Sequence, residues 1–197
     1  MISGDGARVA LPLFQGEDGG SIPTSPLQLC VGRLTLDRAI SLNNLWHSRL
    51  PNANKSNLLR TKHCLCFGAY YANKIYAVAI WTNPIARHFN DKNWLELRRF
   101  AITSDAPKNT ASRLLKIMTA IIKAELPHIE MIISYQDTDV HSGTIYKASG
   151  WYIGNKTKAR EVRWGVQNKQ GTSRKRNPIV AKGDKIRWQK TIRMCDE

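Results

Sequence analysis

The sequence predicts a single mixed α/β domain in which helices flank a central, partly antiparallel sheet. Residues 63–71 and 75–81 are two runs of β-favouring residues, and the short polar step between them is typical of a hairpin. Further along, strand patterns alternate with helical ones, which favours parallel pairing there. A chain of 197 residues with 42% hydrophobic and 23% charged residues can bury one core.

The first quarter of the chain predicts a strand and a helix behind a loose segment. Residues 1–26 are rich in Gly, Ser and Pro and are expected to be loose, and residues 27–34 predict a strand. We expect Asp37 to cap a helix that runs to about Trp46. The polar residues 52–57 then predict a loop.

The middle of the chain carries the clearest patterns. After the hairpin and a loop over residues 83–91, residues 94–102 form a strand with apolar residues on both faces, so we expect it to be central. Residues 106–109 lead into a helix over residues 110–125. Its apolar residues recur at helical spacing, at Ala111, Leu114, Leu115, Met118, Ile121 and Ile122.

The last third predicts shorter elements. Residues 130–135 are a short buried strand, and residues 143–149 are a short helix that Gly150 ends. A further strand starts at residues 151–154, and residues 179–194 return as one or two strands. The expected order is therefore β-α-β-β-β-α-β-α-β.

The charge points to a polyanionic partner. The chain has 30 Lys and Arg against 15 Asp and Glu, and nucleic acid is the commonest polyanion that a basic protein meets. Residues 158–197 hold twelve of these basic residues, with Trp164 and Trp188 among them to stack on bases. We expect this basic extension to complete the sheet and to contact nucleic acid. Its expected nucleic-acid-binding residues are Arg163, Arg174, Lys175, Arg176, Lys185 and Arg187.

Membrane and export signals are missing from the sequence pattern. The longest apolar stretch, residues 76–81, is far shorter than a membrane span, and no signal-peptide pattern opens the chain. The four cysteines form no CxxC pair, and Cys64 and Cys66 are expected to be a reduced, buried pair on one strand face. These features favour a cytoplasmic location, without a membrane partner.

Two features suggest anion binding. Arg98 and Arg99 lie in the middle of an apolar strand, and we expect Arg99, on the face of Leu95 and Leu97, to meet a carboxylate or an anionic ligand in a cleft. The start of the helix at 110–125 offers free backbone N–H groups and the positive end of the helix dipole. Candidate residues there for binding an anionic cofactor are Asn109, Thr110, Ser112 and Arg113; simple capping by Asn109 or Thr110 is the alternative.

A second cluster follows the strand at 130–135. Asp137 lies just past its end, and ligands gather at the carboxyl ends of strands in open α/β sheets. His141 and Tyr146 follow within ten residues, so a general base, an acid or metal ligands are all open, as is a simple turn. His47, at the end of the first helix, stays a structural residue on its position alone.

Four segments resemble the Mom family of phage DNA-modification proteins, and the last also resembles the second half of GNAT-type acyltransferases. The segments are WHSRLP (46–51), ELRRF (96–100), DAPKNTASRLL (105–115) and SYQDTDVHSGTIYKASGWYIG (134–154). The resemblance implies a GNAT-like catalytic core over residues 27–157. It also implies an enzyme that converts adenine in duplex DNA to the N6-carbamoylmethyl form and so protects phage DNA from host restriction.

The resemblance also implies site residues. The family's functional positions fall on His47, Arg99, Ser112 and Asp137, with Tyr146 where GNAT enzymes often place an acid. His47, Asp137 and His141 are the implied ligands if the chemistry needs a metal, of which iron is the first candidate.

The donor stays open. GNAT enzymes carry Arg-x-x-Gly-x-Gly/Ala before this helix, to hold the pyrophosphate of coenzyme A, and here Ala106 and Asn109 replace the Arg and the first Gly. Acetyl-CoA or a related small-molecule donor is therefore expected without a settled grip. The alternatives are a conventional GNAT acetyltransferase that acts on a protein or RNA amine, and a non-catalytic basic DNA-binding protein. A homodimer is also open.

Overall fold

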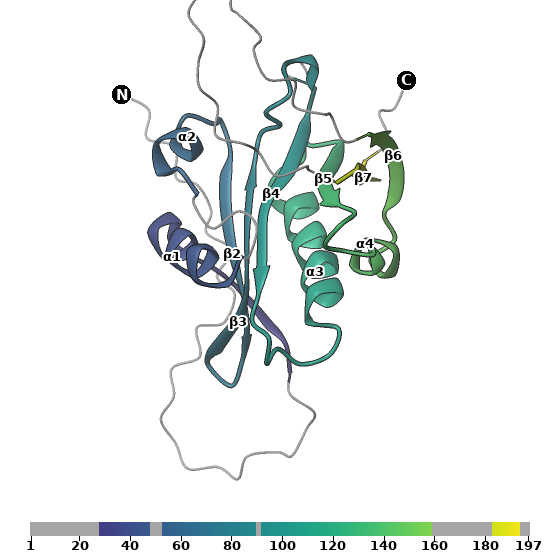
Figure 1. The fold of residues 1–197 in the computed structure, drawn as a ribbon. Helices are drawn as coiled ribbons and strands as arrows, with labels where there is room; N and C mark the ends of the chain where they lie inside the picture. The colour runs from purple at the N-terminus through teal and green to yellow at the C-terminus, as the bar shows by residue number, and fades with distance from the viewer. Residues whose placement is uncertain (1–27, 48–52, 90–91, 159–182, 194–197) are drawn as a thin grey trace, which may run out of the picture.

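The computed structural model describes residues 28–47, 53–89, 92–158 and 183–193. Within them a seven-stranded sheet is flanked by four α-helices (Figure 1). The strands are β1 (Cys30–Arg33), β2 (Cys64–Tyr71), β3 (Lys74–Thr82), β4 (Trp94–Ile102), β5 (Met131–Asp137), β6 (Tyr152–Thr157) and β7 (Lys185–Thr191). The helices are α1 (Leu36–Trp46), α2 (Lys55–Leu59), α3 (Thr110–Glu125) and α4 (Thr144–Ala148), with a 3-10 turn η1 (Arg87–Phe89).

The sheet is mixed, as the sequence predicts. Its strand order is β1-β2-β3-β4-β5-β7-β6, and β4 lies in the middle. β4 and β5 are parallel, whereas every other neighbouring pair is antiparallel. The parallel pair follows from the crossover through α3, since a parallel connection needs a helix-length link.

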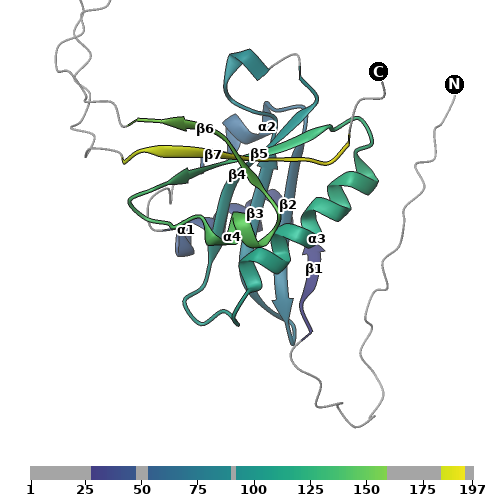
Figure 2. The same ribbon diagram turned by 90° about the vertical axis from the view of Figure 1, so that its right-hand side faces the viewer.

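Helices cover the two faces of the sheet differently. α3 and α4 pack on one face, and α1 and α2 pack on the other (Figures 1 and 2). The larger core joins α3 to β3 and β4 through Leu114, Met118, Trp81 and Leu97. The smaller core joins α1 and α2 to β2, β3 and β4. The helical period predicted for residues 110–125 is confirmed by the fully buried Leu114, Leu115, Met118 and Ile122.

Several predicted boundaries need correction. Thr35, not Asp37, caps α1, because its hydroxyl accepts the N–H of Arg38. The predicted loop over residues 52–57 contains the start of α2, which Asn54 caps. α2 has only five residues, too few for a helical period to stand out in the sequence.

The C-terminal stretch supplies an inner strand. β7 lies between β5 and β6, so residues distant in sequence join the sheet. The prediction that Trp188 stacks on nucleic acid is wrong: it is 2% exposed, stacks on Tyr146 and donates its indole N–H to Gln136. The predicted division at residues 26 and 157 stays a prediction.

Two smaller observations bear on the expectations from cysteine content and hydropathy. Cys66 is buried and Cys64 half-buried on β2, both as free thiols, so only half of the expected burial is confirmed. None of the helices in the described part of the chain is long and apolar enough to cross a membrane.

Candidate functional site

The two central strands separate part of the way along. β4 and β5 pair from Trp94 and Met131 as far as Leu97 and Ser134, and in the described structure their pairing ends there although both strands continue. At this point the Ser134 hydroxyl donates to the carbonyl oxygen of Leu97 over 3.4 Å and shares a 2.8 Å hydrogen bond with the Tyr146 hydroxyl. We call this place the strand split.

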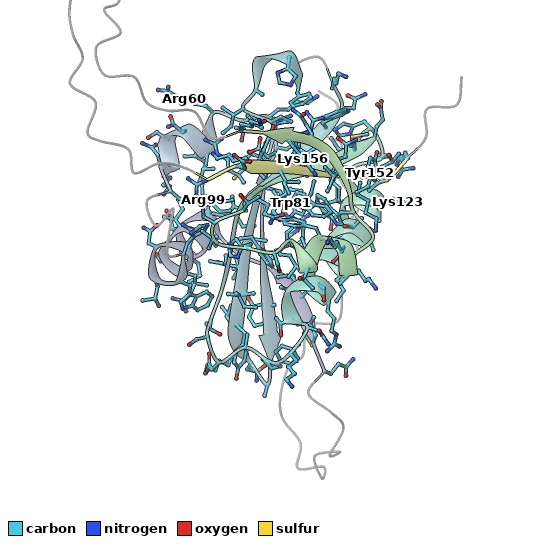
Figure 3. All side chains as sticks on the ribbon, turned by 45° about the vertical axis from the view of Figure 1, so that its right-hand side comes forward. Arg60, Trp81, Arg99, Lys123, Tyr152 and Lys156 are labelled. Carbon is cyan, nitrogen blue, oxygen red and sulfur yellow. The ribbon has the colours of Figure 1, made fainter. Side chains whose placement is uncertain are left out.

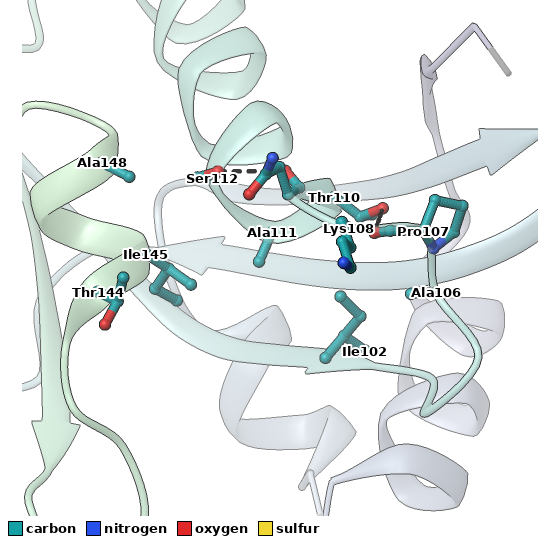
Figure 4. A pocket seen from close by; sticks show the side chains of 11 residues that line it. Ile102, Ala106, Pro107, Lys108, Thr110, Ala111, Ser112, Thr144, Ile145 and Ala148 are labelled. Atoms are coloured by element: carbon teal, nitrogen blue, oxygen red, sulfur yellow. Dashed lines mark hydrogen bonds between the residues drawn. The ribbon is translucent and has the colours of Figure 1, made fainter. Parts of the chain in front are cut away.

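A pocket lies on the α3 and α4 side of the split. It encloses about 290 Å³ between the end of β4, the start of α3 and α4 (Figure 4). Its walls combine backbone and small polar groups at the start of α3 with apolar side chains opposite. The lining residues are Ile102, Ala106, Pro107, Lys108, Asn109, Thr110, Ala111, Ser112, Thr144, Ile145 and Ala148.

The residue that caps the start of α3 has a left-handed backbone conformation although it is not a glycine. Asn109, its N-cap residue, has a φ of 64° and makes no capping bond through its side chain. Among non-glycine residues, Asn tolerates this conformation best. The loop therefore has the backbone shape that a glycine would provide. The Thr110 N–H donates to the Pro107 carbonyl over 3.2 Å, and the remaining N–H groups of the first turn are the candidate anion donors.

The predicted cofactor-binding residues around Asn109 fall into those that line the pocket and one, Arg113, that does not. The Thr110 hydroxyl donates to the Pro107 carbonyl over 2.6 Å, and the Ser112 hydroxyl donates to the Asn109 carbonyl over 3.2 Å. Both residues line the pocket, as Asn109 does. Arg113 is exposed on the next turn and does not line it.

The prediction that Arg99 shares a face with Leu95 and Leu97 is wrong. The pairing of β4 with β3 shifts between Leu97 and Arg99, so Arg98 is the extra residue of a β-bulge. Arg99 is thereby moved to the face of Ile80, on which α1 packs (Figure 3). It is half-buried, donates to the Arg98 carbonyl over 2.9 Å, and its Nε atom has no hydrogen-bond partner among the described residues.

The bulge brings Arg99 close to His47, which also lies near His141. His47 follows the last residue of α1, and its backbone N–H donates to the Asn43 carbonyl. Burial lowers the pKa of His47, and the nearby charges of Arg99 and His141 lower it further. His47 is therefore neutral at a lower pH than an ordinary histidine, which suits a proton acceptor.

Asp137 is the last residue of β5 rather than the first residue after it. Its carboxylate oxygen Oδ1 accepts the N–H of Asp139 over 3.1 Å, and its carbonyl accepts the N–H of His141 over 3.1 Å. The turn interpretation is correct for this part, and the same turn carries His141 toward His47. Asp137 also shares a sheet face with Tyr135, two residues before it.

The metal prediction gains no support from this arrangement. In the described part of the chain, no group of three or more His, Cys, Asp or Glu side chains could hold a metal ion. His47, Asp137 and His141 therefore do not make up such a group.

Glu96 is a site residue that the sequence reasoning missed as such. It is 5% exposed on β4, and its Oε2 atom accepts the backbone N–H of Ile85 over 3.1 Å. Burial raises its pKa, while this bond and the charges of Arg98 and Arg99 oppose the shift. The sequence did contain a signal for Glu96, namely a charged residue between two leucines of an apolar strand. A buried charge is tolerated only where the protein supplies partners for it.

Tyr146 lies under the split rather than at the surface. It is 6% exposed, between Trp188 and Trp151, with its hydroxyl on Ser134. Burial raises its pKa, so it holds its proton at neutral pH. It reaches the split from the α4 side, opposite to His47 and Arg99.

The predicted DNA-binding residues are only partly visible. Lys185 is exposed at the start of β7. The guanidinium of Arg187 is instead packed over the rings of Phe89 and Trp94, 5.1 and 5.9 Å from their centres. Arg163, Arg174, Lys175 and Arg176, like Trp164, lie outside the described residues.

Comparisons with known proteins agree with this geometry. The sequence model of the Mom protein family matches residues 31–194. No curated protein matches the chain. Among solved structures, the ribosomal-protein-S18-alanine N-acetyltransferase from Escherichia coli has a TM-score of 0.59 at 14% identity, covering 86% of this chain and 97% of its own.

Two further structures of the same fold contain a ligand. A Bacillus subtilis acetyltransferase in complex with CoA has a TM-score of 0.51 at 15% identity, and covers 83% of this chain and 97% of its own. A GNAT family acetyltransferase from Elizabethkingia anophelis with acetyl-CoA bound has a TM-score of 0.52 at 15% identity, with the same coverage. At these identities the similarity establishes the GNAT fold alone.

Proposed function

Because the chain belongs to the Mom protein family, we propose that it modifies adenine in duplex DNA, forms N6-carbamoylmethyladenine and so protects phage DNA from host restriction. The observation that carries the proposal is the strand split. The pocket at α3 and α4 lies on one face of the sheet, whereas His47 and Arg99 lie on the other face and Asp137 ends β5 beyond the split. Two substrates can then meet from opposite faces.

The pocket fits an anionic small-molecule donor such as acetyl-CoA or a related compound. The left-handed Asn109 and the first turn of α3 present backbone N–H groups, and Lys108 adds a positive charge. Solved structures of the same fold contain CoA and acetyl-CoA, which supports this donor class. When bound, such a donor would supply the transferred group. Acetyl-CoA itself carries an acetyl group without nitrogen, so the carbamoylmethyl product requires a related donor that also brings the amide nitrogen.

The other face suits an amine whose lone pair is weakly nucleophilic. The N6 lone pair of adenine is delocalised into its ring, so the base must be extruded, oriented and relieved of a proton. Asp137 and His47 are the proton acceptors, and His47 is neutral at pH 7 because its pKa is lowered. Arg99 supplies positive charge beside them, and the protonated Tyr146 can donate a proton at the split.

Mass spectrometry of nucleosides from co-expressed plasmid DNA tests the proposal. We expect an adenosine species of carbamoylmethyl mass with the wild type and none with Asp137→Ala. Asp137→Asn is the matched variant: it keeps an oxygen for the N–H of Asp139 but loses the charge. Full modification by Asp137→Asn would contradict a proton-accepting role, whereas loss in both variants with DNA binding kept supports it.

The second candidate is a conventional acetyltransferase that acts on a protein or RNA amine. The fold of the E. coli ribosomal-protein N-acetyltransferase favours it. Unmodified plasmid DNA from folded wild-type protein, together with acetyl transfer from acetyl-CoA to a peptide amine, would establish this candidate. An acetyl adduct on adenosine would keep the DNA substrate but change the donor.

A further inference from the structure

Tyr135 is a large aromatic residue left exposed at the centre of the sheet. It lies on β5, one residue after the last rung that β5 forms with β4, and it is 40% exposed. The described helices on its face, α1 and α2, pack on β2, β3 and β4, which leaves its ring open. Burial nevertheless raises its pKa, as does the nearby charge of Glu96, so the phenol stays neutral.

The ring of Tyr135 is held from the side by Arg187. The two residues are direct cross-strand partners on β5 and β7, and Arg187 lies close enough to the phenol to oppose the rise in its pKa. The same guanidinium lies over Phe89 and Trp94, whose rings stack with centres 4.5 Å apart. An aromatic ring fixed in this way loses little side-chain freedom when a second flat group is placed on it.

The position of Tyr135 relates it to the proposed reaction. Asp137 is two residues further along the same face, and Ser134, whose side chain marks the split, precedes it. Lys185 on β7, the cross-strand partner of Asp137, adds an exposed positive charge on the same face of the sheet. Flat aromatic surface beside positive charge is the combination that binds unstacked bases of nucleic acids.

We propose that Tyr135 is the platform on which the extruded adenine stacks, and that Arg187 positions its ring. The inference rests on the proposed function and specifies how that site holds its base. Stacking would direct N6 toward the split and would compensate for part of the stacking that the base loses when it leaves the duplex. Base–aromatic stacking contributes roughly 1–3 kcal/mol per base, which corresponds to a loss of roughly 5- to 150-fold when the ring is removed.

Three variants separate stacking from other roles. Tyr135→Leu removes the ring but keeps apolar volume, and Tyr135→Phe keeps the ring but loses the hydroxyl that faces Arg187. Tyr152→Leu is the control, since Tyr152 is similarly exposed, at 46%, but lies on the outer strand β6. Thermal unfolding establishes that each variant is folded.

The first readout is binding, which needs no donor. Fluorescence anisotropy compares a fully paired duplex with the same duplex carrying an adenine opposite an abasic site. We expect the wild type, Tyr135→Phe and Tyr152→Leu to bind the unpaired adenine more tightly than the paired one, and Tyr135→Leu to lose this preference. An unchanged preference in folded Tyr135→Leu overturns the inference.

The second readout is modification of plasmid DNA at limiting expression. If the wild type modifies adenine and Tyr135→Leu modifies it equally well, the platform is wrong and the proposed function stands. If the wild type leaves adenine unmodified while the preference for unpaired adenine still depends on Tyr135, the proposed function fails and the base-stacking platform stands.

Discussion

Replacing Tyr146 by phenylalanine distinguishes a proton donor from a structural hydroxyl. The substitution removes one buried hydrogen bond, to the Ser134 hydroxyl at 2.8 Å, and leaves the ring between Trp188 and Trp151. Ser134 keeps its bond to the Leu97 carbonyl. The free energy of unfolding should therefore fall by only about 0.5–1.5 kcal/mol, which lowers the melting temperature by about 1–6 °C in a domain of this size.

The catalytic expectation for Tyr146→Phe is much larger. A positioned proton donor contributes roughly 10²–10⁴-fold to a rate, equivalent to about 2.7–5.4 kcal/mol of activation free energy. We expect the initial rate of adenine modification to fall by at least about 100-fold, with little change in the concentration of DNA needed for half-maximal rate. The two magnitudes do not overlap, so one variant measured in two assays decides the question.

Tyr71→Phe calibrates the stability cost. The Tyr71 hydroxyl shares a buried 3.0 Å hydrogen bond with Thr110, so its loss should lower stability by a similar amount. If Tyr146→Phe lowers stability as Tyr71→Phe does and keeps its modification rate within about threefold of the wild type, Tyr146 only anchors α4 to β5.

Two further substitutions test the site by other means. Glu96→Gln should be more stable than the wild type at pH 7 but less active. Burial raises the pKa of Glu96, so native protein loses stability as rising pH ionises this group, whereas Gln does not titrate. Chemical denaturation at several pH values checks this, and an advantage that shrinks with rising pH would contradict it. Asn109→Gly should keep stability within about 1 kcal/mol, because glycine adopts a φ of 64° freely, whereas Asn109→Val should lose about 1–2 kcal/mol. Equal melting temperatures for the two variants would show that this backbone conformation is not under strain.

Local patterns in the sequence identify the elements that position the site. The alternation in β2 and β3, the apolar residues of β4 and the helical period of α3 each depend on neighbours within one element. The predicted ranges 94–102 and 110–125 agree with β4 and α3 residue for residue. Local pattern is therefore sufficient to locate the start of α3 and the turn after β5.

The predictions from sequence are wrong where the pairing between neighbouring strands decides which face of the sheet a side chain lies on. The bulge at Arg98 depends on how β4 pairs with β3, and no residue pattern within β4 indicates it. The bulge places the Arg99 side chain on the opposite face of the sheet and so changes which residues Arg99 contacts. The error at Trp188 has a related cause: Lys185 and Arg187 lie on one face of β7, whereas Trp188 alternates to the other face, where it is buried.

The strand split explains why the candidate residues are scattered along the sequence. Past Leu97 and Ser134 the two strands continue without pairing to each other in the described structure, and backbone polar groups left there need another partner. Ser134 and Tyr146 occupy the first position of the gap, and a donor bound beyond them can satisfy more. Under the proposed function, each face of the sheet contributes its own helix ends: α3 and α4 to the donor pocket, and α1 to the side that would hold the base. A site that joins two substrates through a sheet requires residues from both faces, and their order in the sequence follows the topology rather than the chemistry.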